Sequence, residues 1–312
     1  MRIYRLLLPA LLLIAMAGIS LAQLTPEERA QVIMSNNYWV TPNIVYGTAN
    51  NYQLKLDVYR PFHAKAPTPV VMVIHGGGWV AGSKEERIFE GLPYMQMGFA
   101  VVNVEYRLGE VSLAPAAVED CLCALHWVAQ NAAKYNFDVT KIVTSGGSAG
   151  GHLALTTGMI PSSAGLDAEC AASHNSWGTP NLTPLPKVAA IINWFGITDV
   201  ADMLHGEDAR SYVIDWLGSQ PNRDEIARRV SPINYVRPDL PPILTIHGDK
   251  DPLVPYSQAV RLHQALDKAG VRNQLLTVPG AGHGGYTDEQ EIKGWEAVKA
   301  WLISAGVAPV KQ

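Results

Sequence analysis

A serine between glycines follows an apolar run in the segment IVTSGGSAGGHLAL, residues 142–155. With Gly146 and Gly150, Ser148 forms a G-x-S-x-G pattern, in which a strand turns sharply into a helix and exposes the serine. The glycines are needed because so tight a turn leaves no room for Cβ atoms. The start of the following helix directs N–H groups at the same point, which suits negative charge. Ser148 is therefore a candidate nucleophile, although a glycine-rich turn without catalytic meaning would show the same pattern.

A serine hydroxyl is a weak nucleophile that needs a base, and the base needs an orienting acid. Among nine histidines, His283 lies in VPGAGHGG, where the flanking glycines would expose it in a loop. The segment TIHGDKDPLVP offers Asp249 and Asp251 as the acid. Asp251 is favoured on position, because Pro252 stiffens the chain after it whereas Asp249 falls within the turn. His247, at the end of the apolar run, is expected only to shape the turn.

Three consecutive glycines follow another apolar run in VIHGGGWVAG. Attack on an ester carbonyl creates an oxyanion that preorganised N–H donors must stabilise. The backbone N–H groups of Gly77, Gly78 and Ala149 are predicted to supply those donors. His75 is expected to hold the glycine loop, and Trp79 to wall the pocket. A phosphate-binding loop is the alternative, but neither a following Lys-Ser/Thr nor a G-x-G-x-x-G spacing occurs here.

Aromatic residues near strand ends and irregular segments are candidates for lining an aryl-accepting pocket. They include Trp177 and Trp194, with Phe195 and Tyr286 beside them. Trp194 and Phe195 also fit as ordinary core residues at the end of a buried strand, which is the favoured interpretation for Phe195. For Trp177 the sequence favours neither role.

The elements that must position these residues alternate between strands and helices. Residues 53–59 alternate between apolar and polar side chains, as in a half-buried strand. Continuous apolar runs predict strands buried on both faces of a parallel sheet, over residues 70–74, 99–104, 142–144, 188–195 and 243–246. Helical spacing predicts helices over residues 114–134, 149–159, 257–269 and 289–305. This alternation indicates an α/β fold with right-handed crossovers.

Neither an internal repeat nor a low-complexity linker marks a second domain. Residues 23–312 are therefore predicted to form one domain. Two irregular segments interrupt its pattern, near residues 161–187 and 201–232. Segments this long are usually functional, and the second one fits a small helical cap over the sheet.

The composition and charge of the chain limit the kinds of partner that it can bind. The chain has 312 residues, of which 48% are hydrophobic and 17% charged, as in a compact soluble protein. Its formal net charge is −4, and basic residues form no run. Nucleic-acid binding is excluded on this ground, because it depends on clustered cations. No Cys/His spacing resembles a zinc site, so no metal is expected.

The first 22 residues differ from the rest. A short basic start with Arg2 and Arg5 precedes an apolar run, and Ser-Leu-Ala ends the segment at Ala22. This pattern predicts a signal peptide cleaved after Ala22. A membrane anchor is the alternative, but the run is shorter than the ~20 residues a spanning helix needs. The mature protein is expected to be secreted or periplasmic, without a stable membrane anchor.

Export bears on the three cysteines, Cys121, Cys123 and Cys170. Cys121 and Cys123 are two residues apart in a predicted helix, so they point away from each other. In an oxidising compartment either could bridge to Cys170. Burial of all three as small apolar side chains is an equal alternative.

The order Ser148, Asp251, His283 and the segments around these residues resemble the α/β-hydrolase superfamily. The resemblance is to its HGGGW-type esterase and lipase group, similar to hormone-sensitive-lipase-like carboxylesterases and bacterial feruloyl and acetylxylan esterases. It extends over about residues 46–301 and includes VEYRL, VEDC, NWFGITD and SPINYV. It implies a mostly parallel sheet of about eight strands with helices on both faces, Asp251 as the acid, and neither metal nor cofactor.

In function, the resemblance implies a secreted serine carboxylic ester hydrolase that forms an acyl-enzyme. The expected substrates are short-acyl or aromatic esters, such as acetyl or feruloyl esters of the plant cell wall, either small or linked to polysaccharide. Arylformamidases resemble the same pattern, so amide hydrolysis is an alternative, although export argues against it. A non-catalytic small-molecule receptor on this fold is a weaker alternative, because all three catalytic candidates are present.

Overall fold

The computed structural model describes residues 23–168, 170 and 185–308. The expected signal peptide, residues 1–22, and the candidate Trp177 both lie outside the described residues. Among the described residues, no helix combines the length and apolar character that crossing a membrane requires.

The chain divides into two compact units, residues 1–36 and 37–312. Helix α1 (Pro26–Asn37), of which all but the last residue lies in the first unit, is preceded by a reciprocal pair of hydrogen bonds. The Thr25 N–H donates to Glu28 Oε2 at 2.7 Å, and the Glu28 N–H donates to Thr25 Oγ1 at 3.2 Å. Such pairs satisfy N–H groups that the first helical turn leaves without partners.

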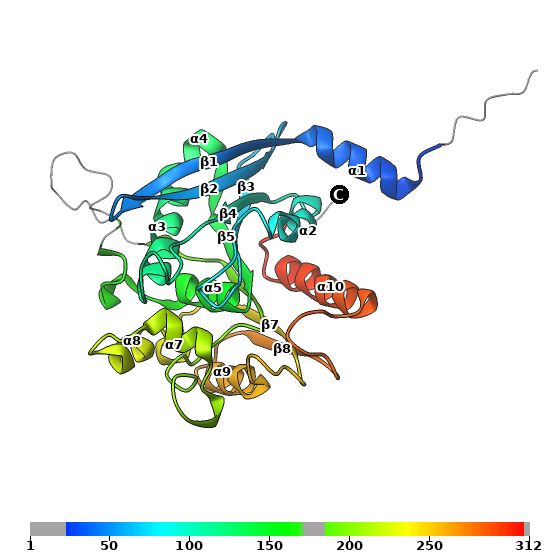
Figure 1. Cartoon of the computed structure of the whole chain (residues 1–312). Coiled ribbons are helices and arrows are strands. Elements are labelled where there is room, and N and C mark those ends of the chain that lie inside the picture. The colour runs from blue at the N-terminus through cyan, green and yellow to red at the C-terminus, as the bar shows by residue number, and fades with distance from the viewer. Residues whose placement is uncertain (1–22, 169, 171–184, 309–312) are drawn as a thin grey trace, which may run out of the picture. The chain divides into compact units, whose positions relative to one another are not determined.

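The second unit contains an eight-stranded sheet in the order β1-β2-β4-β3-β5-β6-β7-β8 (Figure 1). β1 pairs antiparallel with β2, and β2 pairs antiparallel with β4, whereas the other neighbours are parallel. The prediction of a mostly parallel sheet of about eight strands is confirmed. The strands are β1 (Tyr38–Ala49), β2 (Tyr52–Pro61), β3 (Thr68–Ile74), β4 (Ala100–Val104), β5 (Phe137–Gly147), β6 (Ala190–Trp194), β7 (Ile243–Gly248) and β8 (Asn273–Val278).

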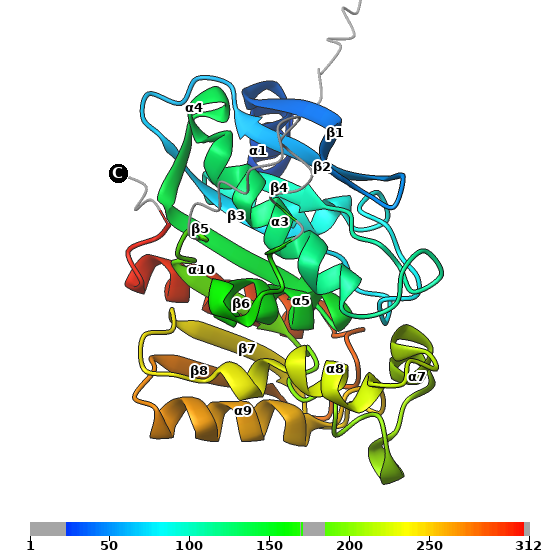
Figure 2. The ribbon, with the colours of Figure 1, turned by 90° about the vertical axis from the view of Figure 1, so that its left-hand side faces the viewer.

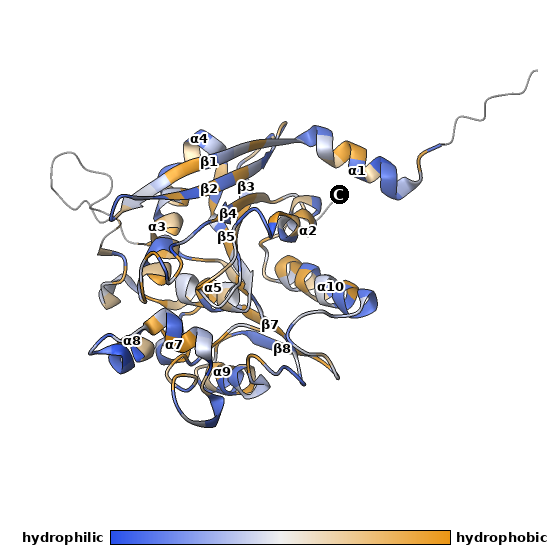
Figure 3. Ribbon diagram, viewed as in Figure 1, coloured by the Kyte–Doolittle hydropathy of each residue, from blue (hydrophilic) through white to orange (hydrophobic). Residues whose placement is uncertain are grey.

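The central strands form where the sequence has continuous apolar runs, and Figure 3 shows their apolar character. Successive side chains of a strand point to opposite faces. In β3, Val70, Met72 and Ile74 therefore enter one core, whereas Val71 and Val73 enter another. A sheet with a core on each face needs helices on both sides.

Helices cover both faces of the sheet (Figure 2). Side chains from α3, α5, α7, α8 and α9 enter the core that contains Met72, and those from α2 and α10 enter the core that contains Val73. The helices are α2 (Leu92–Gln96), α3 (Ala116–Gln130), α4 (Ala132–Tyr135), α5 (Ala149–Met159), α7 (Ser211–Leu217), α8 (Arg223–Arg229), α9 (Tyr256–Lys268) and α10 (Asp288–Ser304).

Three predicted helices differ from the structure, and the one predicted over residues 257–269 is α9 (Tyr256–Lys268), shifted by one residue. The single helix predicted over residues 114–134 is two helices, α3 and α4, which meet at Asn131. Helix α10 begins at Asp288 because Thr287 and Gln290 form a capping box before it. The irregular segment 201–232 contains the short helices α7 and α8.

The cysteines form one disulfide. Cys123 of α3 is bonded to Cys170, with their Cα atoms 4.9 Å apart. Cys121 is unpaired and buried, on the other side of the helix from the bond. The bridge ties the chain before the segment 171–184 to helix α3.

Candidate active site

Ser148 lies in the sharp turn between β5 and α5, with φ +58° and ψ −123°. A positive φ is strained for a residue with a side chain and often marks a functional position. The turn is pressed against β3, because a Cβ atom at Gly146 would be 2.4 Å from the Ile74 carbonyl oxygen, and one at Gly150 only 2.0 Å from it. Bare backbone at both positions therefore lets the turn present Ser148.

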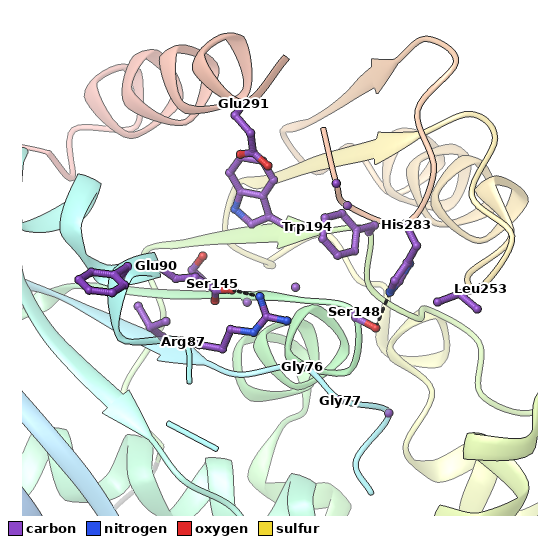
Figure 4. A pocket seen from close by; sticks show the side chains of 18 of the residues that line it. Gly76, Gly77, Arg87, Glu90, Ser145, Ser148, Trp194, Leu253, His283 and Glu291 are labelled. Carbon is purple, nitrogen blue, oxygen red and sulfur yellow. Dashed lines mark hydrogen bonds and ion pairs between the residues drawn. The ribbon is translucent and has the colours of Figure 1, made fainter. Parts of the chain in front are cut away.

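The structure brings Ser148, His283 and Asp251 into one hydrogen-bonded chain. The Ser148 hydroxyl donates to His283 Nε2 at 2.8 Å (Figure 4). His283 Nδ1–H donates to Asp251 Oδ2 at 2.7 Å. Asp249, the other candidate acid, instead accepts the Gly280 N–H at 2.7 Å. That bond holds the loop before His283, so the two aspartates have separate contacts.

Asp251 is held as a carboxylate. Its side chain is completely buried, and its Oδ1 accepts the N–H groups of Leu253 at 2.8 Å and Val254 at 2.9 Å. Burial alone would raise the pKa of Asp251, but hydrogen bonds from His247, His283 and the Val254 amide outweigh it and lower that pKa below its usual range. A charged carboxylate therefore faces the His283 imidazole.

His247 contributes a contact that the sequence did not predict. Its Nε2 lies 3.1 Å from Asp251 Oδ2 and 3.1 Å from the Val254 carbonyl oxygen, so one N–H is shared between them. The imidazole is fully buried at the end of β7. Asp251 Oδ2 thus accepts from two histidines. The only signal in the sequence was the spacing His-x-x-x-Asp in TIHGDKD.

The glycine loop faces the same point. Gly77 and Gly78 have φ of +111° and +61° and line the cavity beside Ser148. Within the described part of the chain, no group accepts a hydrogen bond from the backbone N–H of Gly77, Gly78 or Ala149. Ala149 directly follows Ser148 and opens α5. All three donors predicted for an oxyanion therefore remain available near the serine.

His75 holds the glycine loop in place through contacts of its side chain and backbone. Its Nδ1–H donates to the Gly76 carbonyl oxygen at 2.8 Å, and its ring stacks on Tyr106 with centroids 4.2 Å apart. The Tyr106 hydroxyl donates to the His75 carbonyl oxygen at 3.0 Å. Burial lowers the pKa of His75 to about 4, so the imidazole is neutral near pH 7.

Trp79 lies in the core and does not wall the cavity, which corrects the expectation from its sequence position. Its indole is 0% exposed and stacks on Trp216 of α7 with centroids 4.1 Å apart. Its Nε1–H donates to His152 Nδ1 at 3.2 Å. The backbone of Trp79 has a positive φ of +61°, and with this conformation its ring packs on Trp216 and not in the cavity lining.

A cavity of about 720 Å³ opens at Ser148 (Figure 4). The predicted Trp194 and its neighbour Phe195 line this cavity. Phe195 also packs edge-on against the His283 ring, with centroids 4.8 Å apart. Among the described residues, no group of three or more His, Cys, Asp or Glu side chains could hold a metal ion.

Comparison with known proteins agrees with this architecture. Residues 56–266 match the model of the BD-FAE family. The chain belongs to the BD-FAE family. The BD-FAE match contains Ser148 and Asp251 and ends before His283. The fold is the α/β-hydrolase fold, with its mostly parallel sheet between two layers of helices.

Two relatives of this BD-FAE protein are named esterases. Esterase LipC of Mycobacterium tuberculosis is 30% identical over 239 residues, which are 73% of this chain and 56% of LipC. Esterase LipQ of the same organism is 28% identical over 253 residues, which are 78% of this chain and 56% of LipQ. The chain thus spans little more than half the length of these curated relatives.

Two solved structures are similar over most of the chain. A truncated carbohydrate esterase from gut microbiota has a TM-score of 0.72 and 29% identity, covering 86% of this chain and 96% of that one. The propionate-bound thermophilic esterase 2 of Thermogutta terrifontis has a TM-score of 0.71 and 29% identity, covering 88% of this chain and 97% of that one.

Proposed function

We propose that this protein is a serine carboxylic ester hydrolase with Ser148, His283 and Asp251 as its catalytic triad. The observation that carries the proposal is the unbroken chain of hydrogen bonds from Ser148 Oγ through both His283 nitrogens to Asp251 Oδ2. The esterase names of its relatives and structural neighbours support the same activity.

In the proposed reaction His283 Nε2 removes the hydroxyl proton as Ser148 Oγ attacks the ester carbonyl carbon. The backbone N–H groups of Gly77, Gly78 and Ala149 stabilise the oxyanion. Asp251 orients the His283 imidazole and stabilises its cationic form. The C–O bond to the alcohol then breaks, and the alcohol leaves with the proton from His283. Water repeats the cycle and releases the carboxylic acid from Ser148.

For the substrate we propose short-acyl or aromatic esters, such as acetyl or feruloyl esters of the plant cell wall, small or attached to polysaccharide. The cavity supports this class because it is large enough for an aromatic acyl group and has aromatic walls at Trp194 and Phe195. The carbohydrate esterase among the structural neighbours supports the link to sugars.

We further propose that the mature protein is exported after cleavage behind Ala22. The apolar leader supports this location. The disulfide between Cys123 and Cys170 also supports it, because such bonds persist in oxidising compartments. N-terminal sequencing of protein recovered from outside the cytoplasm should begin at Gln23, and a sequence beginning at Met1 would contradict the cleavage.

The activity is tested with methyl ferulate and with acetylated xylo-oligosaccharides, by measuring released ferulate and acetate. Ser148→Ala provides the blank and should lower kcat by ~10⁶, by analogy with other serine nucleophiles. At least one product should exceed the blank. A Ser148→Ala protein that keeps more than a tenth of the wild-type rate would exclude Ser148 as the nucleophile.

A further inference from the structure

The turn after Asp251 contains two peptide groups whose N–H bonds face its carboxylate. The N–H groups of Leu253 and Val254 donate to Asp251 Oδ1 at 2.8 and 2.9 Å. In a trans peptide group the C=O and N–H bonds lie in one plane and point in opposite directions. The carbonyl groups of Pro252 and Leu253 belong to these same two peptide groups, so they point away from Asp251. Whatever binds these carbonyl groups therefore also sets the direction of the two N–H bonds.

Two side chains at the start of helix α7 bind both carbonyl groups. Arg210 Nε donates to the Leu253 carbonyl oxygen at 3.1 Å, and Arg210 Nη2 donates to that of Pro252 at 3.5 Å. The Tyr212 hydroxyl donates to the Leu253 carbonyl oxygen at 3.0 Å. Each peptide group of the turn thus accepts from α7 on one side and donates to Asp251 on the other. Hydrogen bonds in such a chain polarise and strengthen one another.

The Tyr212 hydroxyl is held as a donor. Burial raises the pKa of Tyr212, Arg210 lowers it, and the charge of Asp251 raises it further, so the net shift is upward. The proton therefore stays on the hydroxyl near neutral pH. The Leu253 carbonyl group has no proton to give, so it always accepts this hydrogen bond.

The other end of helix α7 is anchored by aromatic contacts. Trp216 is fully buried, and its ring stacks on Trp79 with centroids 4.1 Å apart. The same ring packs edge-on against His152 of α5, with centroids 5.6 Å apart. Trp79 belongs to the glycine loop, and α5 begins directly after Ser148. Helix α7 therefore connects the glycine loop and the helix of the nucleophile to the turn that carries the acid.

Tyr212 also contacts the glycine loop directly. A Cβ atom at Gly78 would lie 2.9 Å from Tyr212 Cβ and 3.1 Å from its Cγ. Tyr212 and Leu253 line the cavity together with His283. In Figure 4, Leu253 and His283 lie on the same side of Ser148. One side chain thus touches a proposed oxyanion donor and the turn of the proposed acid.

We infer that Arg210 and Tyr212 are positioning residues, which hold Asp251 through the peptide groups of its turn and so keep His283 aligned with the departing alcohol. This inference rests on the proposed function, because it assigns the support of the same triad. Helix α7 is then part of the catalytic framework and more than a cover over the sheet. Without this support the carboxylate and the imidazole lose their alignment, whereas the serine keeps its place in the turn before α5.

The test compares phenyl, 4-chlorophenyl and 4-nitrophenyl acetate, which share one acyl group and differ in the basicity of the departing phenolate. The 4-nitrophenolate ion leaves with little help, whereas the more basic phenolate depends more on the proton from His283. Poor alignment of the imidazole should therefore slow phenyl acetate most and 4-nitrophenyl acetate least. The ratio of their kcat/KM values does not depend on the fraction of folded protein.

Three variants remove the donors in steps. Tyr212→Phe keeps the ring against Gly78 and should lower kcat/KM for phenyl acetate by about 2–10-fold, as for a neutral hydrogen bond. The double variant Tyr212→Phe and Arg210→Met also loses the charged donor, so the fall should be about 10–100-fold. Its ratio of phenyl to 4-nitrophenyl acetate should drop by about 3-fold or more. Arg210→Lys keeps a charged donor and should lose less than Arg210→Met.

Tyr235→Phe is the matched control. The Tyr235 hydroxyl also donates to a carbonyl oxygen, that of Arg229, at 2.6 Å. Both residues lie in the connection between β6 and β7, to which α7 belongs, and neither belongs to the turn after Asp251. The ratio in Tyr235→Phe should equal that of the wild type. An unchanged ratio in the double variant, or an equal change in Tyr235→Phe, would overturn the inference.

A Ser148→Ala blank separates this inference from the proposed function. Cleavage of the three acetates by the wild type and not by Ser148→Ala, with an unchanged ratio in the double variant, would overturn the positioning role alone. If none of the acetates is cleaved above the blank, the proposed function fails, and this inference fails with it.

Discussion

At the scale of single residues, Asp251 is the most heavily coordinated member of the site. Two backbone N–H groups bind its Oδ1, and two imidazoles bind its Oδ2. The sequence predicted Ser148, His283 and Asp251 because each lies in a short segment with its own signature. It did not predict the role of His247, because that contact depends on how the turn after β7 folds back.

The first prediction concerns His247 as a positioning residue for Asp251. His247→Leu removes one donor from a buried carboxylate and should lower kcat/KM for 4-nitrophenyl acetate by about 10–100-fold, the range for a hydrogen bond to a charged group. His247→Gln keeps an N–H donor and should lose less. Equal losses in the two folded variants would contradict a role through the hydrogen bond.

At the scale of elements, two turns build the site. The strand–turn–helix around Ser148 and the glycine loop after β3 were both predictable from glycine spacing. The direction of Trp79 was not, because a positive φ at that residue turns its ring toward Trp216 and away from the cavity. Backbone conformation of this kind leaves no periodic pattern in a sequence.

The second prediction concerns the glycine loop. A Cβ atom at Gly77 would lie 2.0 Å from the Ala81 carbonyl oxygen, so Gly77→Ala must displace the loop and its N–H donors. The loss of oxyanion stabilisation should lower kcat by ~10²–10³. Gly270→Ala is the matched control, because Gly270 also has a positive φ, of +70°, but open space around it.

Steady-state kinetics and thermal unfolding of both glycine variants should be compared. Both lose some stability, since alanine is strained at a positive φ. Only Gly77→Ala should lose kcat in the folded protein. A similar kcat in both variants would argue against the glycine loop as the source of the donors.

At the scale of the whole molecule, the site is assembled at the carboxyl ends of the parallel strands. The α/β class and most strands were predictable, because apolar runs alternate with helical spacing. The lining of the cavity was not, because Arg87, Trp194 and Glu291 are far apart in sequence and meet only through the strand order. Loops and helix ends that follow different strands of the second unit converge there.

The third prediction is a loss of stability in acid. His75 and His152 are fully buried, and burial lowers the pKa of each to about 4. His152 Nδ1 accepts the Trp79 indole N–H, which requires a neutral imidazole. Unfolded histidine titrates near pH 6.5. Between that pH and about 4 the unfolded chain binds more protons, so the free energy of unfolding falls as pH falls.

Urea unfolding at about pH 7, 6 and 5 measures this slope, which should include ~1.4 kcal/mol per pH unit from each histidine below about pH 6. His152→Gln should show a slope smaller by that amount, whatever its absolute stability. Identical slopes for the wild type and His152→Gln would contradict the burial of a neutral His152.

The central claim, that Ser148 is a nucleophile activated by His283, is tested most directly by covalent trapping. The wild-type protein would be treated with diethyl 4-nitrophenyl phosphate, and nitrophenolate release and the modified peptide would be measured together. The account predicts one nitrophenolate per chain and a diethylphosphoryl group on Ser148, with trapping by His283→Ala slower by ~10⁴ or more. A label on another residue, or ester hydrolysis that continues at full rate after Ser148 is modified, would contradict it.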